Sequence, residues 1–434
     1  MKKIVWFFIG FLMLAANAFA ARPVYLLDIN GAIGPATESY IENGLATAAK
    51  EKAAAVIIQL NTPGGLETSM RGINQTILNS SVPVVAYVAP AGARAASAGT
   101  FIMYASHIAA MAPGTNVGAA SPVSMETLGS SGDSNNKKTL QKKSMNDAFA
   151  YIQGLAKLRD RNVEWAGDAV SKAASLDATE ALNQKVINFI ATDIPELLKK
   201  IDGQTVDIKK IPVQINTKDI EIKNLAPNWR SKFLSVITNP SIAYILLLIG
   251  IYGLFFELAN PGFILPGVVG TFSLLIGLYA FQLLPISYVG LTLLLLGIAF
   301  MIAEAFVTSY GLLGVGGFIA FVVGSIFLFD TSVPGFHIAW SIIIVMSLIS
   351  VGLLCLIIWL TTKSIRQPVV TGREALIGTI GEVLEYYTDY MLVRVQGEIW
   401  NAQCEERLQV GQKVRVTKIG NLKLTVEPLS YPEK

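Results

Sequence analysis

Between Arg22 and Gly203 the chain alternates short runs of β-branched residues with segments of helical periodicity. The apolar runs VYLLDI, AVIIQL and VVAYVA are typical of buried strands, and ENGLATAAKEKA, between the first two, is typical of a helix. This alternation predicts an α/β domain with largely parallel strands. We place the domain at residues 21–203 and expect a linker of mixed strands and polar residues at 204–237.

The pattern changes at about Ser241, where long apolar stretches begin. Each stretch has close to the ~20 residues that a spanning helix needs. The sequence therefore predicts a polytopic α-helical membrane domain at 238–361 with about five transmembrane helices. The stretches lie at 241–258, 264–284, 287–306, 311–329 and 338–360.

A third pattern occupies residues 372–430, where short strand-like runs alternate with Gly and polar turns. Four or five such strands in about 55 residues predict a small all-β barrel. A different kind of segment, Leu128 to Lys138, is polar and low in complexity, and we expect it to be mobile.

The first 20 residues have a basic start, an apolar core and an A-x-A ending, as in a signal peptide cleaved before Ala21. An uncleaved membrane anchor is the alternative. Either segment exports the α/β domain, and five crossings then return the carboxyl-terminal barrel to the cytoplasm. We expect a multi-pass protein of a bacterial inner (cell) membrane with its α/β domain on the periplasmic or extracytoplasmic side.

Composition excludes several classes of protein. Hydrophobic residues make up 52% of the chain and charged residues 15%, and the mean hydropathy is +0.51, which excludes a purely soluble enzyme. The net charge of +3 is too small for the basic stripe of a nucleic-acid-binding protein. Two cysteines cannot form a disulfide framework, and two histidines leave little room for a metal site. We expect no cofactor and no metal.

The strongest candidate for chemistry is Ser97, in the small-residue turn A-A-S-A-G at the start of a predicted helix. A nucleophilic serine needs a base, an oxyanion site and open access for a carbonyl group. The amides of Ala98 and of Gly65, in the loop NTPGG, could converge on an oxyanion. A turn formed only for packing is the alternative.

The sequence offers no histidine that could serve as the base. His107 lies ten residues after Ser97, about 15 Å along a helix, and is expected to be a partly buried structural residue. His337 lies at the edge of the last apolar stretch. A lysine can replace histidine where burial lowers its pKa, and the candidates before the apolar-periodic stretch that begins at Met145 are Lys137, Lys138, Lys142 and Lys143.

These motifs together resemble a known family. NTPGG, ARAASAGT, AMAPGTNVGAASPV and a lysine before an N-x-x-x-AYI helix are similar to the ClpP-like serine protease domain of the long-form NfeD membrane proteins, or stomatin-operon proteases. The resemblance continues through NPGFILPGVVG and YGLLGVGG in the membrane region and through VRVQGEIWNA and VGQKVRV in the barrel. It implies a ClpP/crotonase-like α/β fold and an OB-like barrel.

The resemblance also implies functional residues. The nucleophile falls on Ser97, and the base falls on Lys143 by its spacing to AYI, whereas extending the apolar stripe backward from Met145 favours Lys142. In the barrel, a stretch from Tyr387 to Tyr390 replaces the family's Pro-x-Gly turn. The implied partners are a stomatin/prohibitin-like membrane protein, a polypeptide substrate with apolar segments, and further copies of the chain in a homo-oligomer.

Two conspicuous features have structural interpretations. GLLGVGGFIAFVVG resembles a loose dinucleotide fingerprint but lies in an apolar stretch, where it favours close helix packing. Glu257 and Glu304 lie near the ends of apolar stretches, where an interfacial position is less costly than one in mid-membrane.

The motifs and the family resemblance together imply a membrane-bound serine endopeptidase with a Ser/Lys dyad that cleaves apolar segments of stomatin-like partners. The alternative is a non-catalytic membrane scaffold for stomatin- or flotillin-like proteins. An acyl-CoA enzyme of the crotonase type is a weaker interpretation, because export separates the domain from coenzyme A.

Overall fold

The structure is a computed structural model of the 434-residue chain. The predicted signal peptide and residues 128–133 of the polar segment lie outside the described residues. The chain forms two compact units, Met1–Val351 and Gly352–Lys434. The described residues are 22–122, 134–218, 220–259, 261–304, 306–307, 310–329, 333–365, 373–388, 390–420 and 422–429.

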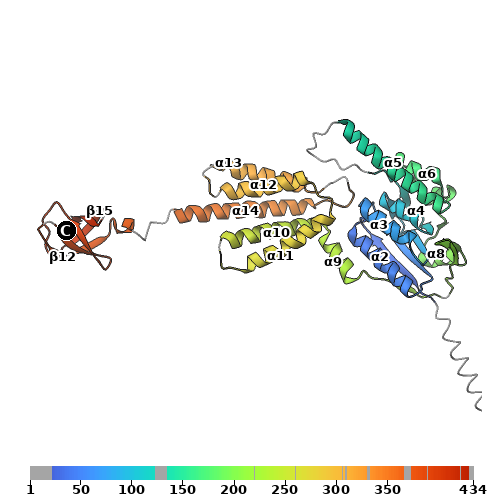
Figure 1. The fold of residues 1–434 in the computed structure, drawn as a ribbon, viewed down its shortest axis with the longest axis horizontal. Helices are drawn as coiled ribbons and strands as arrows, with labels where there is room; N and C mark the ends of the chain where they lie inside the picture. Colours follow the sequence, from blue (N-terminus) through green and yellow to red (C-terminus); the bar gives the residue numbers. More distant parts are fainter. Residues whose placement is uncertain are drawn as a thin grey trace, which may run out of the picture. The chain divides into compact units, whose positions relative to one another are not determined.

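A six-stranded parallel sheet lies at the centre of the α/β region (Figure 1). Side chains of its middle strands alternate between two cores because neighbours on a strand point to opposite faces. Val56 and Ile58 belong to one core, and Ile57 and Val85 to the other. The predicted α/β arrangement with parallel strands is confirmed. In sheet order the strands are β11 (Ile222–Asn224), β1 (Val24–Asn30), β2 (Ala55–Asn61), β3 (Val84–Val88), β5 (Ile108–Met111) and β8 (Phe189–Ile190).

Helices cover both faces of this sheet. Residues of α2 and α3, such as Ile41 and Ile73, pack into the first core, whereas Leu197 of α8 packs into the second. A smaller sheet of β4 (Arg94–Ala96), β6 (Asn116–Gly118) and β7 (Ser175–Asp177) stands beside the first. The helices are α2 (Pro35–Lys50), α3 (Glu67–Leu78), α4 (Ala98–Ala105), α5 (Ser134–Leu158), α6 (Val163–Ser171), α7 (Ala178–Asn183) and α8 (Ile194–Ile201).

The segment expected to be a linker, 204–237, belongs to the α/β region instead. It begins with a hairpin of β9 (Thr205–Ile208) and β10 (Ile211–Gln214), and its strand β11 pairs in parallel with β1. Helix α9 (Trp229–Ile237) then packs on α2, where the hydroxyls of Ser39 and Ser231 lie 3.2 Å apart. The linker expectation missed β11 because its three residues are exposed and carry no apolar pattern.

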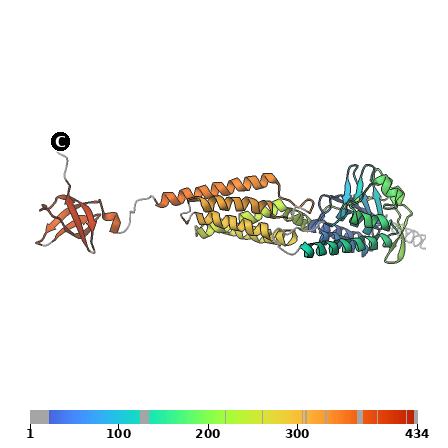
Figure 2. The same ribbon diagram turned by 90° about the horizontal axis from the view of Figure 1, so that it is seen from above.

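A helix occupies each of the five apolar stretches predicted from the sequence. Two of them, α10 and α11, are long and apolar enough to cross a membrane, and shorter apolar helices follow. The number of crossings stays a prediction. Helices α10 to α13 run side by side in both views (Figures 1 and 2). The five are α10 (Pro240–Ala259), α11 (Leu265–Leu283), α12 (Tyr288–Glu304), α13 (Leu312–Ile326) and α14 (Trp340–Ile365).

The hairpins α10–α11 and α12–α13 form an internal repeat. A Cβ atom on Gly270 would lie 2.9 Å from Leu254 N, and one on Gly317 would lie 2.8 Å from Gly297 O, so glycine allows each pair of helices to touch. Close packing, expected for GLLGVGGFIAFVVG, is thereby confirmed. Five residues of the first hairpin have a residue of the same type 47 positions later in the second hairpin. In the first hairpin they are Gly250, Glu257, Gly267, Gly270 and Gly277. Their counterparts, in the same order, are Gly297, Glu304, Gly314, Gly317 and Gly324.

The two repeated glutamates have backbone partners. The Glu304 carboxylate accepts from the amides of Gly311 and Gly314, both at 2.9 Å, and so caps the start of α13. Glu257 accepts from the Gly262 amide at 3.4 Å. These bonds support the structural interpretation of both residues.

The second unit contains a closed five-stranded barrel, which confirms the predicted small β-barrel. A short 3₁₀ turn, η2 (Arg373–Leu376), precedes it. The stretch from Tyr387 to Tyr390, which stands where a Pro-x-Gly turn was expected, lies between the first two strands of the barrel. The centres of the Tyr387 and Tyr390 rings stack at 4.9 Å. The strands are β12 (Ile380–Tyr386), β13 (Met391–Val395), β14 (Glu398–Gln403), β15 (Lys413–Ile419) and β16 (Lys423–Pro428).

Candidate active site

Ser97 stands at the sharp turn between β4 and α4. Its backbone has φ 53° and ψ −115°, an unfavourable conformation for a residue with a side chain and one that clusters at functional sites. Its amide donates to the Gly118 carbonyl at 2.9 Å, which holds the turn. The side chain is half-buried, and its hydroxyl does not cap α4. A strand–serine–helix turn of this kind presents the Oγ atom to its surroundings.

Two buried threonines fix the turn from either side. Thr62, just after β2, donates its amide to the Arg94 carbonyl at 2.7 Å, and its carbonyl accepts from the Ala96 amide at 3.1 Å. The Thr100 hydroxyl donates to the Gly118 carbonyl at 2.9 Å and accepts from the Gly118 amide at 3.1 Å. Neither threonine was among the candidates predicted from the sequence, although both lie in the motifs NTPGG and SAGT.

The loop NTPGG touches the serine directly. Gly64 has φ +115°, and a Cβ atom there would lie 2.6 Å from the Cβ and 3.1 Å from the Oγ of Ser97. At Gly65 a Cβ atom would lie 2.0 Å from the Ile33 carbonyl oxygen. Both positions therefore require glycine, because any side chain would collide with the serine or with the neighbouring backbone.

Two backbone amides near Ser97 are unpaired. Among the hydrogen bonds of the described residues, neither the Gly65 amide nor the Ala98 amide has an acceptor. Ala98 is the first residue of α4, where the helix dipole adds partial positive charge. Both residues line the same cavity as Ser97. Free amides beside a serine can hold the negative oxygen that forms when the serine attacks a carbonyl group.

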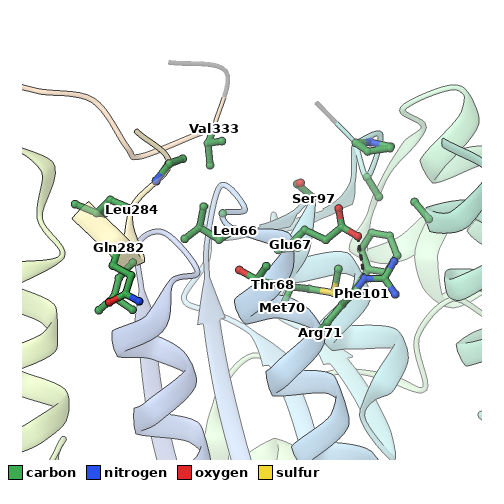
Figure 3. A pocket seen from close by; sticks show the side chains of 17 residues that line it. Leu66, Glu67, Thr68, Met70, Arg71, Ser97, Phe101, Gln282, Leu284 and Val333 are labelled. Carbon is green, nitrogen blue, oxygen red and sulfur yellow. Dashed lines mark hydrogen bonds and ion pairs between the residues drawn. The ribbon is translucent and has the colours of Figure 1, made fainter. Parts of the chain in front are cut away.

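The cavity has a volume of about 380 Å³, and Ser97 lies on its wall (Figure 3). Most of its lining is apolar, so it fits an apolar segment better than a charged one. The lining residues from the α/β region are Gly65, Leu66, Glu67, Thr68, Met70, Arg71, Ser97, Ala98, Phe101, Ala120, Pro122 and Ala148. The others, Gln282, Leu283, Leu284, Pro285 and Val333, come from the membrane region.

Arg71 is the cation of the cavity wall. Its Nε donates to Glu67 at 2.8 Å, and a second nitrogen pairs with Asp147. Its guanidinium also lies 4.6 Å from the centre of the Tyr151 ring. Arg71 thus joins α3 to α5, and its charge is balanced by two carboxylates. Phe101 stacks on the same Tyr151 ring at 5.9 Å.

Lys143 is exposed on α5 and is not among the residues that line the cavity, and the same holds for Lys142. The structure therefore does not bring the predicted base into the lining with Ser97, Gly65 and Ala98. Helix α5 begins at Ser134, so residues 134–138 of the polar segment are helical. Packing of the later turns of α5 continues the helix into this polar stretch.

His107 is a structural residue, as predicted. It is only 8% exposed, and its Nδ1 accepts the Val84 amide at 3.2 Å. Burial, with the nearby charges of Arg159 and Arg161, lowers the pKa of His107 to about 3. It follows the carboxyl-terminal end of α4, opposite Ser97, and is therefore unsuited to act as the base.

The two arginines beside His107 serve backbone carbonyls. Arg159 donates to the Ala105 carbonyl at 2.9 Å, and Arg161 donates to the Met103 carbonyl and to the Ser106 carbonyl at 3.0 Å. These groups satisfy the last carbonyls of α4. Burial lowers the pKa of Arg161 to about 9. Sequence reasoning missed this cluster, because nothing in the motif R-D-R indicates burial.

Within the described ranges, no group of three or more His, Cys, Asp or Glu side chains could hold a metal ion. Cys355 and Cys404 are free. The cavity itself brings together the Ser97 hydroxyl and the free amides of Gly65 and Ala98.

Three family models match the chain in succession. Residues 23–225 match the NfeD1b N-terminal domain, and residues 241–360 match the NfeD integral membrane domain. Residues 373–428 match the NfeD-like C-terminal, partner-binding domain.

Two curated relatives are similar over most of their length. The membrane-bound protease PH1510 of Pyrococcus horikoshii is 34% identical over 98% of this chain and 98% of its own. The membrane protein NfeD1b of Bacillus subtilis is 29% identical over 72% of this chain and 70% of its own.

Solved structures of a membrane-bound, stomatin-specific protease, 1510-N, are also similar. A serine-to-alanine mutant is 37% identical, with a TM-score of 0.44 over 48% of this chain and all of that one. A lysine-to-alanine mutant in complex with a substrate peptide is 37% identical, with a TM-score of 0.45 over 50% of this chain and 98% of that one.

Proposed function

The chain belongs to the long-form NfeD family and is a membrane-bound protease, and we propose that Ser97 is its nucleophile and Lys143 its base. The amides of Gly65 and Ala98 are proposed to form the oxyanion hole. One observation carries this proposal. The strained turn presents Ser97 to an apolar cavity in which two neighbouring amides have no acceptor.

In the proposed reaction, the neutral amine of Lys143 removes the proton from the Ser97 hydroxyl as Oγ attacks a peptide carbonyl carbon. The two amides stabilise the resulting oxyanion. The protonated lysine then donates its proton to the leaving amine, and an acyl-enzyme remains. Water, deprotonated by the same lysine, attacks the ester carbon. The lysine then returns this proton to the Ser97 Oγ as the second product leaves, which restores the free serine and the neutral amine.

Helix geometry supports Lys143 over Lys142. Lys143 is four residues before Asp147, and side chains four residues apart lie on the same face of a helix. Asp147 contacts Arg71 of the cavity wall, so Lys143 lies one turn before Asp147 on the side of α5 from which this contact is made. Lys142 is rotated from that face by about 100°.

Lys143 is exposed on α5, so it is in contact with water in the resting enzyme. A lysine base needs a site from which water is excluded. We propose that a bound substrate, or contact with a second copy of the chain, excludes water from the exposed turn around Lys143 and completes the dyad. The enzyme is then active chiefly in its substrate complex or as a homo-oligomer.

The proposed substrate is an apolar segment of a stomatin-like membrane protein. The mostly apolar lining of the cavity supports an apolar substrate, and the 1510-N relative is described as stomatin-specific. The barrel matches a partner-binding family domain, so we propose that it holds the stomatin/prohibitin-like partner.

We also propose a multi-pass arrangement in a bacterial inner membrane. The protease domain lies outside the cytoplasm and the barrel inside, because an exported domain followed by five crossings must end in the cytoplasm. A reporter fused after Lys434 should be active only in the cytoplasm, and one inserted near Ser134 only outside it. Cytoplasmic activity of the reporter near Ser134 would contradict the export signal.

The nucleophile is tested by labelling the purified full chain with a fluorophosphonate and mapping the modified residue by mass spectrometry. We expect the label on Ser97 and none in Ser97→Ala. Ser121, a half-buried serine whose hydroxyl donates to the Val170 carbonyl, offers a matched control as Ser121→Ala. A chain that is folded, stays unlabelled and still binds its partner would favour the scaffold alternative.

A further inference from the structure

One wall of the active-site cavity is built by the membrane region. Gln282 and Leu283 end helix α11, Leu284 and Pro285 follow it, and Val333 precedes α14. Figure 3 shows Gln282, Leu284 and Val333 on the side of the cavity away from Ser97. Ser97 and the wall that begins at Gln282 thus come from parts of the chain nearly 200 residues apart.

This wall is an ordered part of the fold. Ser287 donates its amide to the Leu328 carbonyl at 2.8 Å, and Ile286 forms a β-bridge with Phe329. The Phe329 ring meets the Phe281 ring edge to face at 5.7 Å. Leu284 is 6% exposed. The two membrane-region loops therefore support each other and hold the wall in position.

Several contacts join these loops and their helices to the α/β region. A Cβ atom on Gly34 would lie 3.2 Å from the Phe336 ring, and one on Gly335 would lie 2.7 Å from the Ala32 Cβ. Within the α/β region, the Tyr40 hydroxyl donates to the Leu225 carbonyl, shortly before α9, the helix that leads into the bundle. The wall is thus anchored to the region that carries Ser97.

The wall lies at one end of the helix bundle. Helices α10 and α11 form an antiparallel hairpin, so the end of α11 lies beside the start of α10, which follows α9 almost directly. The loop after α11 also leads into α12. Residues 282–285 therefore mark the end of the bundle nearest the α/β region.

We propose that residues 282–285 and Val333 form a specificity wall that selects an apolar stretch directly adjoining a membrane-embedded part of the substrate. This inference rests on the proposed protease function and defines its substrate class. Leu284, Pro285 and Val333 face the cavity together with Leu66 and Phe101 of the protease domain. A peptide bond close to the bilayer surface reaches the cavity, whereas one far along a soluble domain gains nothing from the wall.

Gln282 gives the sharpest test, because it is the polar and exposed member of the wall. Gln282→Glu places a charge beside an apolar substrate and should lower kcat/KM for an apolar peptide about tenfold, mainly through KM. Gln282→Leu should lower KM. The matched control is Gln75→Glu on the exposed surface of α3, outside the cavity, which should change neither constant.

The substrate class is tested with the full chain in nanodiscs. One cleavable apolar sequence is fused either directly after a transmembrane helix or after a spacer of about 30 flexible residues. We expect cleavage of the adjoining site to be about tenfold faster, and Gln282→Glu to remove most of this preference. Equal rates for both fusions, or a preference that Gln282→Glu leaves intact, would overturn the specificity wall.

A binding measurement separates failure of the wall from failure of the protease. A photoreactive apolar peptide is bound to the Ser97→Ala chain, and the crosslinks are mapped. Crosslinks on residues 282–285 support the wall even if fluorophosphonate labelling disproves the nucleophile. Crosslinks confined to residues 22–225 in a chain whose Ser97 is labelled would refute the wall and leave the protease standing.

Discussion

Helix α4 has a polar side chain beyond each end, and the two ends differ in how they are packed. At the amino-terminal end, Ser97 lies in a strained turn beside a cavity, and the Ala98 amide has no acceptor. At the carboxyl-terminal end, His107 is buried and bonded, and Arg161 fills the space around the last carbonyls. Polar groups at the amino-terminal end are therefore available to a ligand, whereas those at the carboxyl-terminal end are already hydrogen-bonded within the protein.

The contrast indicates which polar residues of a fold can react. Serine and histidine are both frequent in active sites, so their presence near each other in the sequence does not separate chemistry from packing. The strongly lowered pKa of His107 also looks like a functional signal, yet its causes are burial and two structural arginines. An open cavity and unpaired donors are the better guide here.

The largest predicted effect is at the open end of α4. Ser97→Ala removes only the nucleophilic oxygen, so peptide hydrolysis should fall by roughly 10⁴–10⁶-fold while the fold persists. A peptidase assay measures the loss, and thermal unfolding followed by circular dichroism checks the fold. Near-normal hydrolysis by a folded Ser97→Ala chain would show that Ser97 is not the nucleophile.

Lys143→Ala should also abolish hydrolysis, because no other group would then remove the serine proton. Lys142→Ala should reduce activity only modestly, and Lys137→Ala and Lys138→Ala should have almost no effect. If Lys142→Ala is inactive and Lys143→Ala is active, Lys142 is the base. If all four lysine variants keep full activity, the Ser/Lys mechanism is wrong.

Gly65→Val should produce a smaller loss. Its Cβ atom would meet the Ile33 carbonyl, which displaces the amide proposed to hold the oxyanion. Loss of one such donor typically costs ~10²–10³ in kcat. The matched control is Gly203→Ala, which also has a positive φ but no atom within 4 Å of the added Cβ. The control should lose some stability and keep its kcat, whereas equal kcat losses in both variants would indicate a general effect of strain.

Much of this arrangement follows from local sequence patterns. The strands AVIIQL and VVAYVA are apolar enough to be buried, and both loops that follow them contain small residues that can approach closely. These patterns were sufficient to place Ser97 between a strand and a helix. The apolar stretches likewise located five helices, two of which are long and apolar enough to cross a membrane.

Other features depend on contacts between distant residues. Strand β11 is too short and exposed to carry a pattern, and it joins the sheet only because β1 offers a free edge. The helical state of residues 134–138 opposes their polar composition, because the later turns of α5 pack and bond to Arg71. The cavity wall at 282–285 likewise appears only after folding.

The smallest predicted effect concerns the closed end of α4 and its response to acid. The folded pKa of His107, about 3, lies below the ordinary value of 6.5, so between these values the unfolded chain binds more protons than the folded one. Burial of neutral His107 therefore favours folding fully above about pH 6.5. This contribution falls by at most about 1.4 kcal/mol per pH unit as the pH drops toward 3.

His107→Asn, which retains an acceptor for the Val84 amide, should flatten the dependence of Tm on pH between about 6.5 and 4. His337→Asn, at an exposed position, should leave that dependence unchanged. If Tm changes equally with pH in the native chain and in His107→Asn, protonation of His107 does not cause the loss of stability in acid. A loss of kcat in His107→Asn at constant stability would weaken the division between the two ends of α4.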